Sequence, residues 1–323
     1  MRILLIANPK SGKGVAKRLI PKIEDFFKKN YYDAESYITK KPYDAMKIAK
    51  KAAESGKYDI IVSCGGDGTL NEVINGIMMS RDAKKRNKRL KESRKIKEVL
   101  LGIIPFGTEN VLAQVTGIPF NWLRAARTIL DGKIKNIDLG EVIGLKGRGK
   151  QRSKSRFFVL MVGIGFDAHV ASKVKPMLKK LLGSAAYPLS AFKEIIKYKH
   201  PNINILIDGK KKEKGSFVVA GNTNIYGGYA YVTPRAKIDD GLLDVCIFKG
   251  RDIASFLRYG LGVLTKSHTS FKDISYIRAK KILVKSTPNV LCHVDCEIFG
   301  KTPLEIKVHK SAMEIIVPRN KYR

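Results

Sequence analysis

The segment Ser63–Glu72, with the sequence SCGGDGTLNE, determines the fold class of the first half of this chain. It follows an apolar run at Asp59–Cys64 that is typical of a buried strand, and apolar residues at 70, 73, 74 and 77 then share one face of a helix. Thr69 and Glu72 have the spacing of a capping box, which predicts that the helix begins near Thr69. Three glycines in four positions let the backbone approach an oxygen-rich ligand, and a helix N-terminus offers N–H groups to phosphate. The segment therefore predicts a strand, a phosphate-binding loop and a helix in succession.

Asp67 lies in the middle of this predicted anion site. A carboxylate is unfavourable there unless a metal ion or a reacting hydroxyl neutralises it. We therefore interpret Asp67 as a residue with a chemical role rather than as part of an ordinary strand-to-helix turn.

Two further glycine-containing loops follow predicted strands. Asn8–Gly14, NPKSGKG, comes after a strand at Ile3–Ala7, and Pro105–Asn110, PFGTEN, comes after a strand at Val99–Ile104. The first loop is not a Walker motif, because it lacks the upstream glycine and a Ser or Thr after the second lysine. Since the carboxyl ends of parallel strands share one edge of an open α/β sheet, the three loops should converge on one crevice.

The length of 323 residues favours two domains. Residues 1–136 alternate short apolar runs with helical periodicity, as in an open α/β sheet domain. Helices are expected over 15–26 and over Asp44–Ser55. Pro21 should kink or split the first of these helices. Residues 137–311 have the texture of a β-rich second domain. Its expected strands are Lys135–Val142, Phe157–Val162, Ile203–Ile207, Phe217–Gly221, Leu242–Phe248, Ile282–Lys285 and Leu304–Val308, and its expected helices are Ala168–Leu182, Ala186–Tyr198 and Ile253–Leu264.

Acidic residues of the second half gather in two places. Asp239 and Asp240 precede a predicted strand, and Asp295 and Glu297, two residues apart, are expected on one face of a strand. The alternative for both pairs is solvated acids of turns and edge strands. Gly163–Ala168 matches a dinucleotide fingerprint but lacks the acid about 20 residues later, so we interpret it as a tight turn. Cys292, His293 and Cys296 lack a fourth ligand at a zinc-site spacing.

The chain has 62 Lys and Arg against 29 Asp and Glu, a net charge of +33. Such an excess indicates a polyanionic partner: nucleic acid, an anionic membrane or a phosphorylated substrate. Arg81–Glu98 has ten basic and three acidic residues, and Lys146–Arg156 has six basic residues and no acid. Either segment could be a solvated face or an electrostatic contact with a membrane. Nucleic acid is disfavoured, because no aromatic-interleaved basic motif is present.

The longest apolar run, Phe157–Phe166, is far shorter than the roughly 20 residues that span a bilayer. The apolar residues that follow Met1 are too few for the core of a signal peptide. We therefore expect a cytoplasmic protein, and we expect its four cysteines to be free thiols.

Taken together, these motifs resemble the catalytic fold of diacylglycerol and sphingosine kinases, in particular the soluble bacterial lipid kinases related to NAD kinases. The resemblance runs the length of the chain. It rests on Asn8–Gly12, Gly65–Thr69, Gly107-Thr108-x-Asn110, Ile137–Gly140, Gly165–Ala168, Asp239–Asp244 and Asp295–Glu297. Two positions depart from the family pattern: Cys296 stands in place of the glycine of Asp-Gly-Glu, and Val111 in place of the last Asp of Gly-Thr-x-Asn-Asp.

The resemblance implies an N-terminal α/β domain, a C-terminal β-sandwich with ATP in the cleft between them, and packing of residues 312–323 against the first domain. It implies Asp67 and Asp239 as catalytic residues, Glu297 as the general base, and Mg²⁺ bound by Asp240 and the carbonyls of Lys237 and Leu242. The implied ATP contacts are Asn8, Pro9, Lys10, Ser11, Gly12, Thr39, Gly66, Asp67, Gly68, Thr69, Leu70, Asn71, Glu72 and Thr108.

The leading hypothesis is an ATP- and Mg²⁺-dependent kinase that phosphorylates a lipid hydroxyl and associates peripherally with an anionic membrane. One alternative is a kinase for a soluble acceptor such as NAD. The other is a catalytically weak basic module that binds membranes or nucleic acid. The sequence leaves the acceptor lipid and a homodimer open.

Overall fold

The computed structural model describes residues 1–86, 98–146, 151–173, 194–195, 198 and 200–319. The chain divides into two compact units. Unit 1 contains Met1–Ile137 and Ala312–Arg323, and unit 2 contains Asp138–Ser311. The sequence analysis placed this division between residues 136 and 137.

Unit 1 is built on a parallel sheet with the strand order β2-β1-β3-β4. Its strands are β1 (Arg2–Ala7), β2 (Asp33–Ile38), β3 (Ile60–Gly65) and β4 (Leu100–Pro105). Strands β1, β3 and β4 are almost entirely buried, as expected of parallel strands covered on both faces. The last residues of β16 (Leu304–Val317) extend this sheet, because Ile315 pairs in parallel with Leu101 of β4.

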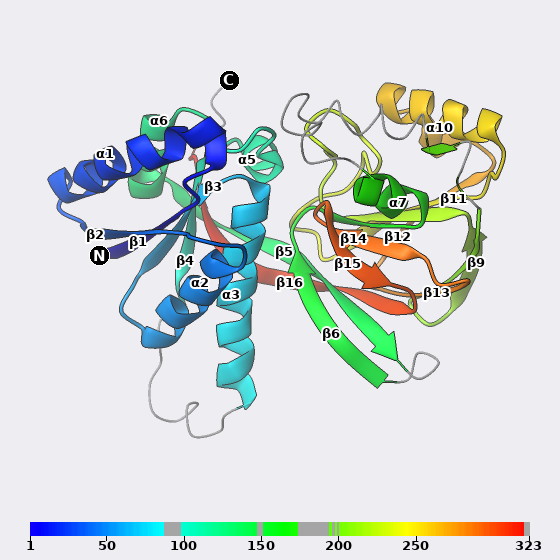
Figure 1. Ribbon diagram of the computed structural model, residues 1–323, viewed down its shortest axis with the longest axis horizontal. Helices are drawn as coiled ribbons and strands as arrows, with labels where there is room; N and C mark the ends of the chain where they lie inside the picture. Colours follow the sequence, from blue (N-terminus) through cyan, green and yellow to red (C-terminus); the bar gives the residue numbers. More distant parts are fainter. Residues whose placement is uncertain (87–97, 147–150, 174–193, 196–197, 199, 320–323) are drawn as a thin grey trace. The chain divides into compact units, whose positions relative to one another are not determined.

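Helices cover this sheet (Figure 1). They are η1 (Ser11–Gly14), α1 (Val15–Lys29), α2 (Asp44–Ser55), α3 (Asp67–Arg86), α5 (Val111–Thr116) and α6 (Trp122–Asp131). Helix α1 packs with α6, and α2 packs with α3. A kink or a split was predicted at Pro21, and the split does not occur. Pro21 lies on the exposed side of one continuous helix, where water can bind the carbonyl of exposed Lys17 that loses its N–H partner.

Unit 2 contains two sheets that pack around one apolar core, so it is β-rich as predicted. The first sheet has the order β12-β11-β10-β7-β14-β15, and all of its pairs are antiparallel. Its strands are β7 (Met161–Ile164), β10 (Phe217–Gly221), β11 (Leu243–Phe248), β12 (Ile274–Ala279), β14 (Leu291–Val294) and β15 (Glu297–Lys301).

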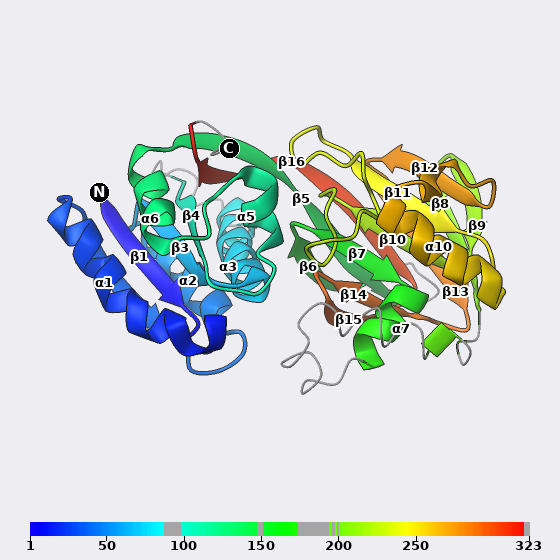
Figure 2. The same ribbon diagram turned by 90° about the horizontal axis from the view of Figure 1, so that it is seen from above.

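In the second sheet the first part of β16 is followed by β13, β8 and β9, and β5 pairs with β16 and β6. These strands are β5 (Lys133–Lys146), β6 (Gln151–Phe158), β8 (Asn202–Ile207), β9 (Lys211–Gly215) and β13 (Lys281–Thr287). Helices α7 (Phe166–Lys173) and α10 (Ile253–Thr265) and the short η3 (His268–Ser270) complete the described part of unit 2. Figure 2 shows α10 lying over the strands of the first sheet.

The prediction of a single strand at Phe157–Val162 was wrong, because these residues belong to two strands. Phe157 and Phe158 end β6, whereas Met161 and Val162 begin β7. The chain turns between them because the N–H groups of residues 159–161 donate to the carboxylate of Asp295 instead of to a neighbouring strand.

Several sequence predictions fall outside the described residues. These are most of the basic segment Arg81–Glu98, residues 147–150 of the second basic segment, residues 174–182 of one predicted helix, and most of Ala186–Tyr198. Within the described residues, no helix combines the length and apolarity needed to cross a membrane.

Candidate functional site

The three glycine-containing loops of unit 1 meet at the carboxyl edge of the parallel sheet. The N–H of Asn8 donates to the carbonyl of Cys64 at 3.1 Å, and the N–H of Phe106 donates to that of Gly65 at 2.8 Å. The side-chain amide of Asn8 lies 3.4 Å from Oγ1 of Thr69. The structure therefore brings together the loops after β1, β3 and β4 that the sequence assigned to one crevice.

Glycine is required where two of these loops touch. A Cβ on Gly107 would lie 2.5 Å from Cα of Gly66 and 2.6 Å from Oδ1 of Asn110. The side chain of Asn110 stabilises the loop with two hydrogen bonds to Gly107. Its Oδ1 accepts from the N–H of Gly107, and its Nδ2 donates to the carbonyl of Gly107, each at 2.8 Å. Glycine at both positions therefore lets the two loops meet backbone to backbone.

Helix α3 begins at Asp67, two residues before the predicted start. The predicted capping box is not formed, because Thr69 lies inside the helix and the Glu72 carboxylate instead accepts from the N–H of Tyr43 at 3.0 Å. Oδ2 of Asp67 accepts from the N–H of Val111, the first residue of α5, at 3.2 Å. Because a main-chain N–H makes this contact, the departure from the family pattern at Val111 does not remove it.

The other residues of the implied ATP set differ in accessibility. Thr39 follows β2, and its N–H donates to the carbonyl of Ala7 at 2.8 Å, which places it at the same edge. Leu70 and Asn71 are only 3 % and 1 % exposed, so their side chains belong to the interior of unit 1. The members of this set that are exposed or partly exposed are Asn8, Pro9, Lys10, Ser11, Gly12, Gly66, Asp67, Gly68, Glu72 and Thr108.

Positive charge gathers beside Thr39. A cavity of about 670 Å³ is lined by Tyr37, Ile48, five lysines at 40, 41, 47, 50 and 51, and two acids, Asp44 and Glu54. Hydrogen bonds from the N–H groups of Lys40 and Lys41 keep the pKa of Asp44 below its usual value, against the opposing effect of burial. The lysine excess favours binding of anions in this cavity, which runs along α2 from Asp44 to Glu54.

In unit 2, buried Asp138 holds the turn that carries Asp239 and Asp240. Its carboxylate accepts from the N–H of Gly241 at 2.5 Å and from the N–H of Ser311 at 2.7 Å. The sequence analysis did not assign Asp138 to the site. The signal was an acid between the apolar residues Ile137 and Leu139, which becomes informative only once its partners are known.

The implied Mg²⁺ ligands fit the metal by the chemistry of their atoms. Asp240 offers a carboxylate, Lys237 and Leu242 offer carbonyls, and Mg²⁺ prefers oxygen ligands. Oδ1 of Asp240 accepts from the N–H of Leu242 at 3.0 Å, and Oδ2 pairs with Arg278, so the metal would share this carboxylate with a guanidinium. The described residues contain no cluster of three or more His, Cys, Asp or Glu side chains suited to a metal.

Asp295 and Glu297 do not lie on one face of a strand, contrary to the prediction. Asp295 and Cys296 have φ of +47° and +66° and form the turn between β14 and β15, whereas Glu297 is the first residue of β15. The Asp295 carboxylate accepts from the N–H groups of residues 159, 160 and 161 at 3.2, 3.1 and 2.9 Å. Oε2 of Glu297 lies 2.6 Å from the Arg156 guanidinium, and its side chain is 45 % exposed. Asp295 is therefore bound by the backbone, while Glu297 remains accessible.

Unit 2 also contains an apolar cavity of about 700 Å³ that the sequence did not predict. Its wall is formed by α10, α7 and the first sheet, and nearly all of its lining is aliphatic or aromatic, with Phe166, Phe217, Phe248 and Phe256 among the residues. Such a volume falls in the range of small-molecule sites.

Asp167 provides a carboxylate on the wall of this cavity. It accepts from the hydroxyl of Tyr226 at 2.6 Å and lies 2.7 Å from Nε2 of fully buried His293. Burial raises the pKa of Asp167, but its interaction with His293 and the hydrogen bond from Tyr226 outweigh it, so the pKa is lowered. The N–H of Cys296 donates to Nδ1 of His293 at 3.2 Å, which engages both ring nitrogens within the protein. The motif Gly163–Ala168, which the sequence analysis interpreted as a tight turn, thus contributes the carboxylate of Asp167 to the cavity.

Comparisons with known proteins agree with this two-unit organisation. Residues 2–142 match the diacylglycerol kinase catalytic domain, and residues 160–317 match the YegS C-terminal NAD kinase beta sandwich-like domain. A diacylglycerol kinase of Bacillus subtilis is 29 % identical over 323 residues, covering 99 % of this chain and 97 % of its own. One from Staphylococcus saprophyticus is 29 % identical over 320 residues, covering 99 % of this chain and 96 % of its own.

Solved structures share the fold at lower identity. A diacylglycerol kinase from Bacillus anthracis has a TM-score of 0.69 at 24 % identity, with 98 % of this chain and 96 % of that chain covered. Yeast NADH kinase complexed with NADH has a TM-score of 0.53 at 13 % identity, with 100 % of this chain and 84 % of that chain covered.

Proposed function

We propose that this chain, a kinase whose residues 2–142 match the diacylglycerol kinase catalytic domain, transfers the γ-phosphoryl group of ATP, with Mg²⁺, to the hydroxyl of a lipid of the diacylglycerol or sphingoid type. The observation that carries the lipid part of this proposal is the apolar cavity of unit 2. A soluble nucleotide such as NAD would require polar partners along its length, whereas an acyl chain requires an apolar wall.

The nucleotide part of the proposal rests on unit 1. Phosphoryl transfer depends on positioning and on neutralising charge more than on covalent chemistry. The backbone contact between Gly66 and Gly107, the start of α3 at Asp67 and the lysine-lined cavity beside Thr39 support binding of a polyphosphate at the carboxyl edge of the sheet.

In the proposed reaction the lipid hydroxyl oxygen forms a bond to the γ-phosphorus, the bond from that phosphorus to the β–γ bridging oxygen breaks, and ADP leaves. Glu297, whose carboxylate Arg156 orients at 2.6 Å, accepts the hydroxyl proton. Asp67 and Asp239 are the other proposed catalytic residues. Mg²⁺, held by Asp240 and the carbonyls of Lys237 and Leu242, would supply charge neutralisation.

The test is incubation of the protein with γ-labelled ATP, Mg²⁺ and vesicles that contain diacylglycerol or a sphingoid base, with NAD as a soluble acceptor in parallel. We expect label in the lipid fraction, loss of labelling when Mg²⁺ is chelated, and loss in Asp67→Asn. Label in NAD alone would favour a small-molecule kinase. Equal lipid labelling by Asp67→Asn would refute the role of that carboxylate, and no labelled product would refute the proposed reaction.

A further inference from the structure

Helix α10 presents a stripe of apolar side chains to solvent. Ile253, Leu257, Leu261 and Leu264 are 47 %, 43 %, 67 % and 57 % exposed, and their spacing of four, four and three residues places them on one helix face. With neighbouring Tyr229, at 40 %, they are five of the thirteen large apolar side chains that are exposed in the described residues. Scattered exposed apolar residues are ordinary, but a contiguous group of this kind indicates an interaction surface.

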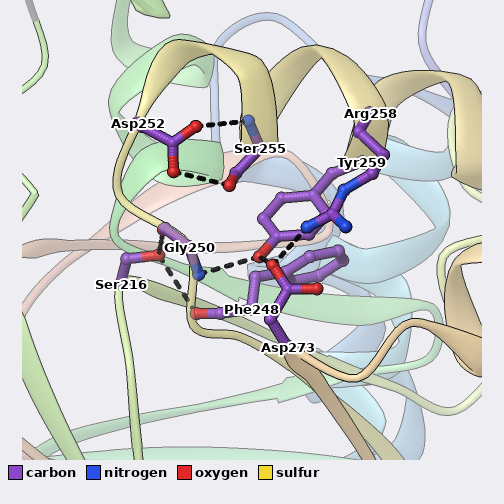
Figure 3. A network of polar contacts seen from close by, with 8 residues as sticks. All are labelled: Ser216, Phe248, Gly250, Asp252, Ser255, Arg258, Tyr259 and Asp273. Atoms are coloured by element: carbon purple, nitrogen blue, oxygen red, sulfur yellow. Dashed lines mark hydrogen bonds and ion pairs between the residues drawn. The ribbon is translucent and has the colours of Figure 1, made fainter.

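The opposite face of α10 is fastened to the first sheet of unit 2, as Figure 3 shows. The Tyr259 hydroxyl accepts from the N–H of Gly250 at 2.8 Å and donates to the carboxylate of Asp273, which also pairs with Arg258 at 2.6 Å. At the start of the helix, Asp252 accepts from the N–H of Ser255 at 2.8 Å. These contacts fix the rotation of α10 about its axis, so the apolar stripe cannot turn toward the core.

The stripe is continuous with the apolar cavity. Leu257, Leu261, Leu264 and Tyr229 are exposed to solvent and also line the cavity. The cavity therefore reaches the surface of unit 2 at the stripe. A ligand that enters there passes from an apolar exterior surface into an apolar interior.

Basic residues flank the stripe. Between Lys249 and Asp273 the chain has five Lys or Arg and two acids. Both acids have partners within unit 2, because Asp252 caps α10 and Asp273 pairs with Arg258. Arg251 and Lys266 lie at the two ends of the helix and are exposed. An apolar face bordered by cations complements the interface of an anionic bilayer, where apolar side chains insert and cations meet lipid headgroups.

We propose that α10 is the membrane-docking element of this protein, lying in the plane of an anionic bilayer with Ile253, Leu257, Leu261 and Leu264 inserted. In that orientation the cavity opens toward the acyl chains, so a lipid substrate can slide in without crossing water. The part of this inference that concerns the substrate rests on the proposed lipid kinase function; the docking itself does not. It differs from docking by the basic segments at 81–98 and 146–156, because an apolar insertion is less sensitive to salt.

The first experiment measures co-sedimentation of the full-length protein with phosphatidylcholine vesicles, with and without phosphatidylglycerol, in the absence of ATP. The variant Ile253→Gln/Leu261→Gln removes two apolar side chains without changing charge, and Phe120→Gln, at a residue 54 % exposed in unit 1, is the matched control. We expect tighter binding to the anionic vesicles, about a tenfold or greater weakening in the double variant, and no change in the control. Equal binding of the double variant and the wild type, with both folded by circular dichroism, would overturn the proposal.

The second experiment separates docking from the reaction. Ile253 is exposed but does not line the cavity, so Ile253→Gln should keep wild-type activity on a short-chain diacylglycerol supplied as monomers and lose activity on sparse vesicles of long-chain diacylglycerol. Vesicle binding without phosphorylation of any lipid would retain the docking surface and refute the lipid kinase function. If light scattering showed a dimer that Leu261→Gln dissociates, while vesicle binding stayed unchanged, the stripe would be an interface between two copies and not a membrane surface.

Discussion

Asp295→Asn is the substitution that best tests the assignment of the two acids around the β14–β15 turn. Asn is the same size and tolerates the φ of +47°. Its single carbonyl oxygen can keep the two N–H donors of Leu160 and Met161, but its NH₂ group then faces the N–H of Val159. The change therefore removes one buried charge-assisted hydrogen bond and weakens two others.

One such bond contributes about 1.5–3 kcal/mol, so we expect the free energy of unfolding to fall by about 3 kcal/mol. For a domain of this size that corresponds to a decrease in Tm of about 6–12 °C. Urea unfolding followed by circular dichroism measures the first quantity, and calorimetry measures the second. Lipid kinase activity well below the melting temperature should be largely retained, because Asp295 supports the turn and does not contact substrate in the proposed reaction.

The matched control is Glu297→Gln. Its carboxylate is half-exposed and contacts Arg156, so its removal should lower the free energy of unfolding by less than about 1 kcal/mol. Loss of the proposed general base should lower kcat by about 10²-fold or more. A stable Asp295→Asn protein, or a Glu297→Gln protein that is unstable but active, would refute the assignment of a structural role to the first acid and a chemical role to the second.

Three further substitutions test other parts of the structure. Gly107→Ala should raise the dissociation constant for ATP at least about tenfold in a calorimetric titration, because the added Cβ would collide with Gly66. Gly260→Ala is the control: its added Cβ would have no heavy atom within 4 Å, so the same constant should stay unchanged. Cys296→Gly should raise the free energy of unfolding by about 0.5–1 kcal/mol, measured in urea, because φ of +66° favours glycine; a loss of stability would show that the thiol has a packing role. Glu141→Gln should lower the free energy of unfolding by about 3 kcal/mol at neutral pH. Burial raises the pKa of the Glu141 carboxyl, but hydrogen bonds from His309 and Lys307 outweigh burial and lower this pKa from 4.5 to about 2. That contribution is present above pH 4.5 and is lost as the pH falls toward 2, so urea unfolding of the wild type and this variant should converge in acid.

The sequence predicted the loops of unit 1 because their signals are local. A strand that ends in glycines and is followed by helical periodicity, as around Gly66, specifies a loop at the carboxyl edge of a parallel sheet. The two-residue error in the start of α3 has a non-local cause: Thr69 and Glu72 have capping-box spacing, but Glu72 has a distant partner, the N–H of Tyr43.

The acids of unit 2 were harder to interpret. Spacing alone paired Asp295 with Glu297, yet the first binds backbone groups and the second pairs with Arg156 at the surface. Spacing also could not show the distant partners of Asp138 and Asp167, which the sequence analysis left without a role in the site.

The amino-acid sequence by itself determined the α/β and β-rich units, the three loops at one sheet edge and the resemblance to lipid kinases, because strand periodicity and glycine spacing act over a few residues. Only the tertiary structure decided which acids are bound by the protein, since Asp295 finds its N–H donors 134–136 residues away and Asp167 meets His293 across 126 residues. It also decided that the apolar face of α10 adjoins a cavity, because the walls of that cavity come from segments between Phe166 and Leu264 that only folding brings together.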